Sequence, residues 1–329
     1  MTETLVHAYT PLILWMSLGL LILKILPTWL PHFLGRALYW VGVPLELLAL
    51  ARKSQQTELS GVESWPLLAS VVTIGALLVG LLVALLIVWG WRKIVCHWLQ
   101  PDLDASLASY WLDPSTQGSF VLAAVLGNTG FVGLAIAPAF IQTDFLNWVV
   151  LYSITHNVVG PYGLGVLIAS YFSHAKSPNR WWMQLRDLLT VPPLWAFVIG
   201  ILTRQVQLPE VMESGLQGSV NIVIACAFLL TGIRLGQLQG WQNFRFAVIP
   251  SVIKVVIMPL LVGLLTTWLL GLSGDRRLAM VLMSGMPSAF AGLILAEEYN
   301  LNRDLIASSI ILSTLLLLLF LPLWIGVFS

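Results

Sequence analysis

Long apolar segments alternate with short polar stretches along almost the whole chain. The apolar segments lie near 8–26, 32–51, 66–91, 117–140, 146–172, 188–205, 214–235, 245–271, 276–298 and 304–328. A helix that crosses a bilayer needs about 20 mostly apolar residues, and these segments are close to that length or longer. The longest polar stretches, near 52–65, 92–116 and 173–187, are too short to form a soluble domain. The pattern predicts an all-α integral membrane protein with ten transmembrane helices.

The amino-acid composition favours a lipid environment. Hydrophobic residues make up 58% of the 329 residues and charged residues only 9%, whereas soluble domains carry roughly 25% charged residues. The formal net charge of +1 gives no indication of a nucleic-acid partner. The N-terminal stretch lacks a basic region and a small-residue cleavage site, so we expect it to be retained as the first span. We therefore predict a multi-pass protein of the cell (plasma or inner) membrane.

The distribution of Lys and Arg among the loops predicts the orientation in the membrane. An even number of spans places both termini on the same side. The cations in the loops on that side are Arg52, Lys53, Arg204, Arg276 and Arg277, and the loops on the other side hold more. Because basic loops stay in the cytoplasm, both termini are expected on the non-cytoplasmic side.

The two halves of the chain resemble each other. At one constant offset, Pro11 matches Pro193 and Arg52 matches Arg234. Each half has five predicted spans, an odd number, so the second copy enters the membrane from the opposite side. Inverted repeats of this kind are a common architecture of secondary transporters. The predicted organisation is a first repeat, a cytoplasmic connecting loop and an inverted second repeat, at 1–172, 173–187 and 188–329.

The fourth and ninth predicted spans contain helix-breaking residues at matching places. The segment GNTGFVGLA at 127–135 matches MPSAFAGLI at 286–294 at a second offset. Glycine weakens a helix, and proline removes an amide donor and clashes with the preceding turn. The residues expected to interrupt the two helices are Gly127, Gly133, Pro138, Gly285 and Pro287. Broken backbone at membrane depth is tolerated only beside protein or a watery cavity, so the breaks predict a site.

Two interrupted helices of opposite direction would bring two half-helix N-termini together near the middle of the membrane. Free N–H groups and the positive ends of the helix dipoles favour an anion at such a place. The expected ligand is the carboxylate of a small organic anion. Its predicted binding residues are Asn128, Thr129, Gly130, Asn157, Pro287, Ser288 and Ala289. The alternative explanation of the glycines is close packing between helices, and Asn157 could equally join two helices by a hydrogen bond.

Three ionisable residues inside predicted spans are candidates for ion coupling or for tethering the structure. His156 could relay a proton, because imidazole titrates near neutral pH, or it could be a neutral packing residue. Lys254 could attract the substrate, tether the core in place of a bound cation, or extend to the membrane surface. Glu46, near the outer end of the second span, could face the transport path or reach the surface.

Several motifs resemble the auxin efflux carrier family, which includes plant PIN auxin exporters and bacterial members and is related to the bile acid:sodium symporters. The resemblance covers essentially the whole chain. The motifs are GNTGFVGLAIAPAF in the fourth span, MPSAFAGLILAEEYN in the ninth, VGVPLELLA in the second and IKVVIMPLL in the eighth. The resemblance implies that helices four and nine cross as broken helices with the substrate carboxylate near the crossing. It also implies an often dimeric scaffold of spans 1, 2, 6 and 7, and an elevator-like moving core of spans 3–5 and 8–10.

The resemblance also assigns individual residues. Asn128 matches the Asn of the fourth-span break, Pro287 the Pro of the ninth-span break, and Asn157 an Asn that faces the pocket. Met286 stands where plant exporters have an Asn before the Pro, which argues against plant-like auxin specificity.

These observations predict a secondary, elevator-type transporter of a small organic anion, such as a carboxylate or an auxin-like indole acid, that works in the export direction. Either H⁺ or Na⁺ is a candidate coupling ion, and the resemblance favours a homodimer. Two alternatives stay open: a membrane-embedded sensor that binds the same anion without transport, and Na⁺-coupled uptake as in the bile acid symporters. The sequence has no HExxH motif, no Cys/His metal cluster and no GxxxxGK[ST] loop, so we expect no metal, no cofactor, no enzyme activity and no ATP-driven pumping.

Overall fold

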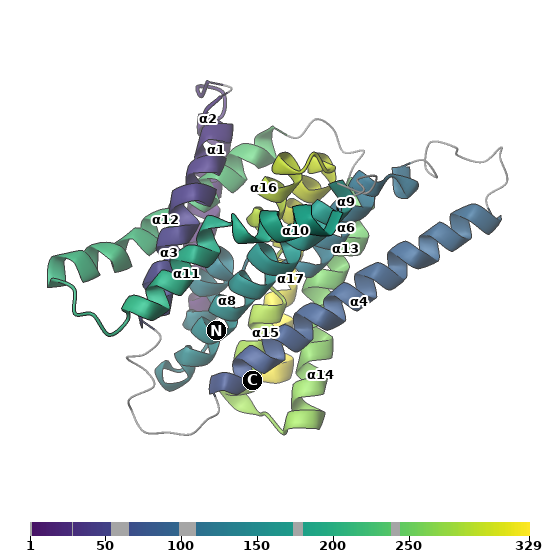
Figure 1. The fold of residues 1–329 in the computed structure, drawn as a ribbon. Coiled ribbons are helices and arrows are strands. Elements are labelled where there is room, and N and C mark those ends of the chain that lie inside the picture. Colours follow the sequence, from purple (N-terminus) through teal and green to yellow (C-terminus); the bar gives the residue numbers. More distant parts are fainter. Residues whose placement is uncertain (1, 28, 54–65, 99–109, 174–179, 238–243) are drawn as a thin grey trace.

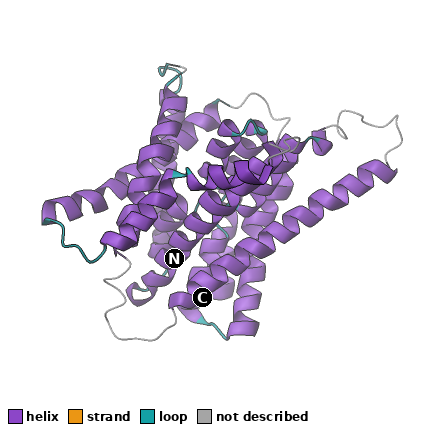
Figure 2. Cartoon of the chain, viewed as in Figure 1, coloured by secondary structure: helices purple, strands orange, loops and turns teal. Residues whose placement is uncertain are grey.

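The computed structural model describes residues 2–27, 29–53, 66–98, 110–173, 180–237 and 244–329, and the predicted loops at 52–65 and 92–116 lie partly outside this set. The described residues are helical apart from short connections and one isolated β-bridge, as the all-α prediction requires (Figures 1 and 2). Helices dominate because lipid offers no hydrogen bonds, so the backbone groups of a spanning segment must satisfy each other.

The first half of the chain contains thirteen described helical elements. They are α1 (Thr2–Ile22), α2 (Leu30–Ala37), η1 (Leu38–Gly42), α3 (Val43–Lys53), α4 (Pro66–Trp98), α6 (Pro114–Val125), η2 (Thr129–Gly133), α7 (Leu134–Ile136), η3 (Ala137–Ala139), η4 (Thr143–Phe145), α8 (Leu146–Val159), η5 (Gly160–Gly165) and α9 (Val166–Ser173). The short segments η1, η2 and η5 are π-helical turns, which are often found at functional sites.

The second half has fewer and longer helices. They are α10 (Arg180–Leu189), α11 (Pro192–Thr203), α12 (Glu210–Gly236), α13 (Phe244–Val252), η6 (Ile253–Ile257), α14 (Met258–Leu270), α15 (Gly274–Ser284), α16 (Phe290–Glu298) and α17 (Arg303–Phe328). The segment η6 is a π-helical turn that joins α13 to α14.

Six described helices are long and apolar enough to cross a bilayer, or seven if a pair bent by 52° (Trp182–Leu189 and Pro192–Thr203) counts as one span. The other three predicted spans, at 117–140, 146–172 and 276–298, are helical in shorter pieces. The predicted total of ten crossings therefore stays a prediction, and the difference lies in the segments that contain the helix breaks or a π-helical turn.

The segment 173–187, predicted as the connection between the two repeats, contains a helix, and its role as the connection stays a prediction. Residues 174–179 lie outside the described set, but α10 occupies most of the remainder. Its sequence, RWWMQLRDLL, places polar and apolar side chains on different sides of a helix. Such an amphipathic helix is stable where one side meets apolar surface and the other meets water. A search for long apolar segments does not detect a helix of this kind.

The helices pack in two groups (Figure 1). In the first group, α1 packs against α12, and α3 packs against both α11 and α12. In the second, α4 packs against α8, α6 against α9, α14 against α15, and α13 against α17. The groups meet where α3 contacts α8 and where α12 contacts η2. This boundary passes beside the helix breaks.

The contact between α1 and α12 depends on glycine. A Cβ added at Gly232 would overlap the backbone carbonyl of Met16, and one added at Gly19 would overlap that of Leu229. The two backbones therefore touch directly, as small residues allow at helix interfaces in membranes.

Candidate functional site

The helix of the fourth predicted span stops at Val125 and resumes at Thr129. Leu126 is extended, with φ −82° and ψ 121°. The side chain of Asn128 then caps the next helical stretch, because its oxygen accepts a hydrogen bond from the N–H of Phe131 at 3.2 Å. Helical structure continues to Ala139, so the second part of this segment begins beside Asn128.

The helix of the ninth predicted span is interrupted in the corresponding place. α15 ends at Ser284 and α16 begins at Phe290, with Pro287 between them. Proline disfavours helical backbone in the residue before it, here Met286. Ala289, directly before α16, is extended with φ −70° and ψ 136°. Pro287 thus lies within the interruption and Gly285 at its start.

The two interruptions pair with each other. Gly127 and Ser288 form an isolated antiparallel β-bridge. The N–H of Asn128 donates to the carbonyl of Pro287 at 2.7 Å, and the N–H of Ala289 donates to the carbonyl of Leu126 at 2.9 Å. Each break therefore satisfies backbone groups of the other, which explains how broken backbone is stable in the interior of the protein.

Buried side chains hold the first break from one side. The Lys254 ammonium, 3% exposed, donates to the carbonyl of Val125 at 3.3 Å, where the last carbonyls of α6 favour a cation. His156 Nε2 accepts from the N–H of Gly127 at 3.2 Å, so Nδ1 carries the proton of a neutral ring and faces the Thr129 hydroxyl at 3.2 Å. Lys254 is therefore buried beside the first break and does not extend to the membrane surface, while its role as a tether stays a prediction.

Hydroxyl groups hold the second break. Ser288 Oγ donates to the carbonyl of Ala123 at 2.8 Å, and the N–H of Ser288 donates to Ser313 Oγ at 3.0 Å. The hydroxyls of Ser288 and Thr129 are therefore engaged within the protein. Their predicted role as donors to a ligand stays a prediction.

A small cavity lies beside the paired breaks. Its lining residues are Glu46, Gly127, Asn128, Gly130, Phe131, Asn157, Pro161, Tyr162, Ala289, Phe290 and Ala291. The space open to the centre of a water molecule is about 20 Å³, room for about one water. The start of each helical stretch after a break contributes to the wall. By helix geometry the N–H groups of Phe290 and Ala291, the first two of α16, have no partner within the helix.

The cavity brings together four of the predicted ligand residues, Asn128, Gly130, Asn157 and Ala289. The remaining ligand candidates do not line it: Thr129 begins η2, and Pro287 and Ser288 lie in the paired backbone. Two helix-break residues serve packing, since a Cβ at Gly133 would lie 2.9 Å from Met283 Cε and one at Gly285 would lie 3.1 Å from Pro259 Cγ. The last predicted helix breaker, Pro138, lies in η3, away from the pairing.

Glu46 reaches the cavity from α3, in the other packing group. It is 2% exposed, and its Oε1 has no hydrogen-bond partner among the described residues. A Cβ added at Gly130 would lie 2.7 Å from this oxygen and 3.0 Å from Asn157 Nδ2, so glycine is required for the close approach. Tyr162, which the sequence reading missed, also lines the cavity, and the GPYG sequence that forms η5 is the signal that could have indicated it.

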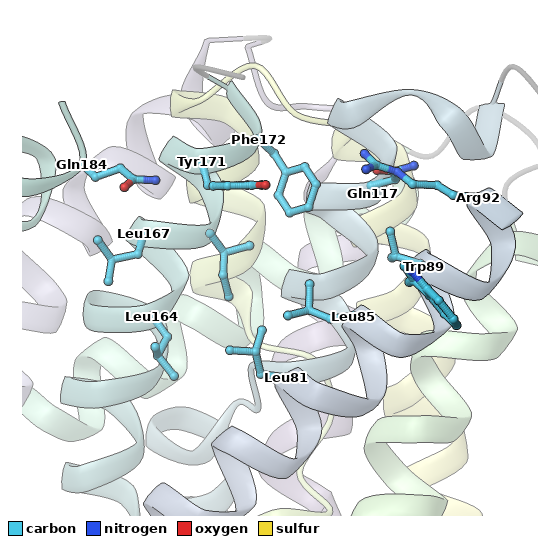
Figure 3. Close-up of a pocket in the computed structure, with 12 residues that line it drawn as sticks. Leu81, Leu85, Trp89, Arg92, Gln117, Leu164, Leu167, Tyr171, Phe172 and Gln184 are labelled. Atoms are coloured by element: carbon cyan, nitrogen blue, oxygen red, sulfur yellow. The ribbon is translucent and has the colours of Figure 1, made fainter. Parts of the chain in front are cut away.

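A second and larger cavity, with about 450 Å³ open to water-sized atoms, lies near the ends of α4, α6 and α9 and extends to Gln184 of α10. Figure 3 shows Arg92 beside Gln117 at one end of it and leucines along its walls, and Arg92 donates to Gln117 Oε1 at 2.5 Å. None of the predicted site residues lines this cavity.

Comparison with known proteins identifies the family of this chain. Residues 69–325 match the family described as membrane transport protein. The chain is 29% identical over 241 residues to an uncharacterized transporter of Methanothermobacter thermautotrophicus, which covers 70% of this chain and 76% of that protein. It is 24% identical over 212 residues to an uncharacterized transporter of Methanocaldococcus jannaschii, with 63% and 67% coverage.

A plant protein is also similar over a shorter region. The chain is 22% identical over 139 residues, 40% of its length, to a probable auxin efflux carrier component of Oryza sativa subsp. japonica, and the match covers 32% of that protein. The family match extends over most of the chain, which also has at least six helices suited to crossing a bilayer. The chain belongs to the membrane transport protein family, with similarity to the auxin efflux carriers, as its motifs predicted.

Proposed function

We propose that this protein is a secondary transporter of a small organic anion, whose carboxylate binds in the cavity beside the paired breaks. One observation carries the proposal: the bridge between Gly127 and Ser288 places the starts of two helical stretches at the wall of one cavity. Helix starts attract anions through free N–H groups and the positive end of the helix dipole. The same construction binds anionic groups in transporters with discontinuous helices.

The chemistry of the cavity wall suits a carboxylate. The side-chain amides of Asn128 and Asn157 line it, and the oxygen of Asn128 is already used in capping, which leaves its N–H groups as donors. Phe131, Phe290 and Tyr162 supply apolar surface for the rest of an organic molecule. No cationic side chain is among the lining residues, so the negative charge would be met by backbone and amide dipoles.

The packing supports the proposed inverted repeat. If the first five predicted spans exchange places with the last five, the pair α1 and α12 becomes the pair α11 and α3, and both pairs are in contact. The pair α4 and α8 becomes α13 and α17 in the same way. Asn128 and Pro287, which the internal alignment matches, also hydrogen-bond to each other, as residues beside a two-fold axis would.

The two packing groups suggest how the site would alternate. We assign α1–α3, α11 and α12 to a scaffold, with a homodimer as its natural assembly, and the helices that carry the breaks to a moving core. The cavity lies at their boundary, because Glu46 belongs to α3 and most other lining residues belong to the core. Since the cavity holds about one water, the core must move relative to the scaffold before an organic anion can enter.

The membrane potential favours export of an anion. A potential of about 100 mV, negative inside, is worth roughly 2.3 kcal/mol for each charge that leaves the cell. This corresponds to about a fiftyfold gradient. Export of an anion down this potential therefore needs no ATP.

Flux of radiolabelled indole-3-acetate, benzoate and lactate into and out of proteoliposomes tests the proposal. We expect counterflow of at least one of them by the natural protein and its loss in Asn128→Ala, while Asn221→Ala, at an exposed position of α12, keeps it. Binding without flux in any gradient would instead identify a sensor, and neither binding nor flux would refute the proposal.

A further inference from the structure

The carboxyl group of Glu46 is the least expected feature of an anion site. It is 2% exposed and lies in the wall of the cavity that the proposed function assigns to a carboxylate. Its Oε1 has no hydrogen-bond partner within the described part of the chain. A buried charge without a partner is costly, so this carboxyl is poised to exchange a proton or to meet a ligand.

Both buried cations among the described residues make contacts elsewhere. Lys254 lies across the break and donates to the carbonyl of Val125. Arg52, on the same helix as Glu46, donates to the carbonyls of Thr203 and Val206 and pairs with Glu213 at 3.1 Å. Neither cation is therefore placed to neutralise Glu46.

The other elements packed against α3 add few titratable groups. η1 contributes Tyr39, whose ring lies 6.1 Å from that of Tyr162 of η5 in the cavity wall. α8 contributes His156, which bonds to the first break, and Tyr152 stacked on it. α11 has no ionisable side chain.

The ionisable groups of α12 do not face Glu46 as unpaired charges. They are Glu210 at its exposed start, Glu213 and Arg234 in ion pairs, and the half-buried Cys226 thiol. Among the described residues Glu46 is thus the one carboxyl of the cavity, with Tyr162 as the one other titratable group in its wall.

An anion whose carboxylate is held beside Asn157 would lie close to the Glu46 carboxyl once the site closes around it, because the two side chains share one wall and both approach Gly130, whose added Cβ would lie 2.7 Å from Glu46 Oε1 and 3.0 Å from Asn157 Nδ2. Two like charges so close in a poorly solvated place cannot both be ionised without a large penalty, and one of them takes up a proton. We propose that the organic anion binds together with one proton held on Glu46, so that Glu46 makes anion binding dependent on pH. This inference rests on the proposed function.

Linkage gives the size of the expected effect. If the site is occupied only when Glu46 is protonated, each bound anion takes up one proton once free Glu46 is ionised. The dissociation constant then rises about tenfold for each pH unit in that range and is constant below it. The protonated carboxyl can donate a hydrogen bond to the ligand carboxylate, which also fills the place of its missing partner.

The test measures binding of indole-3-acetate, benzoate and lactate to the purified full-length protein between about pH 6 and pH 9, where all three are ionised. Calorimetry in two buffers of different ionisation enthalpy counts the protons taken up. We expect the dissociation constant of the natural protein to rise about tenfold per pH unit, with an uptake approaching one proton per bound anion. Glu46→Gln, which cannot ionise, should bind with no slope and no uptake. Glu298→Gln, which changes an exposed carboxyl, should match the natural protein.

Each other result has a definite meaning. Equal slopes in the natural protein and Glu46→Gln, or no proton uptake by the natural protein, overturn the inference but leave the anion site standing. Loss of binding in a folded Glu46→Gln, or binding that disappears when choline replaces Na⁺, also overturns it, because the carboxylate would then act in its charged form. Absence of binding of all three probes refutes the proposed function itself. The proton count of the natural protein decides the question even if Glu46→Gln does not fold.

Discussion

Gly130→Ala tests whether the cavity beside the breaks is the binding site. The added methyl group would lie 2.7 Å from Glu46 Oε1 and 3.0 Å from Asn157 Nδ2, well inside ordinary contact distance. The cavity has room for about one water, so a methyl group would take most of it. The backbone of Gly130 is π-helical with negative φ, so alanine introduces no conformational strain and the fold should survive.

The expected magnitude follows from the overlap. Overpacking of a closed site typically costs about 1–3 kcal/mol. If that cost falls on the liganded state, binding weakens by about 5- to 150-fold. The assay is equilibrium binding of benzoate, lactate and indole-3-acetate, with thermal unfolding measured in parallel to separate loss of binding from loss of fold.

Gly292→Ala is the matched control. It makes the same chemical change in α16, where the nearest atom to the added methyl group would be Ile306 Cγ2 at 3.7 Å, an ordinary contact. We expect natural affinity and equal or slightly higher stability, because alanine favours a helix over glycine. If folded Gly130→Ala binds as tightly as Gly292→Ala, the cavity is not the anion site and the reasoning fails.

Two further substitutions probe the framework. Lys254→Met keeps the apolar stem but leaves the carbonyl of Val125 without its donor, and should lower the free energy of unfolding by about 1–3 kcal/mol. Exposed Lys24→Met should leave the midpoint of thermal unfolding in detergent unchanged, and equal midpoints for the two variants would contradict a tether. Gly232→Ala should separate α12 from α1 and lower the same midpoint by several degrees or abolish folding, since its Cβ meets backbone. Gly215→Ala, on the same helix but in open space, should leave this midpoint unchanged. If Gly232→Ala were equally stable, the two helices could move apart without cost.

The local part of the site could be predicted because it depends on neighbouring residues. Pro287 cannot donate a backbone hydrogen bond within a helix, and Gly127 lowers the stability of a helix. Both interruptions can therefore be predicted from the sequence. The polar capping residue Asn128 is likewise recognisable beside the restart of the helix.

The partners of these residues could not be predicted in the same way. The sequence left three roles open for Lys254, and its choice of the Val125 carbonyl depends on how α13, η6 and α6 pack. The sequence also did not indicate that the hydroxyls of Thr129 and Ser288 meet His156 and the carbonyl of Ala123. A hydroxyl can bond to any polar group within reach, so only the fold decides which.

The sequence by itself determined the apolar helices, the two matching interruptions and the motifs of a transporter family. These follow from local rules, because side-chain polarity, proline and glycine act on their own few residues of backbone. Tertiary structure decided that the interruptions pair with each other and that Glu46 faces them from another helix. Such contacts join residues more than eighty positions apart, and their energy depends on the packing of every helix between them.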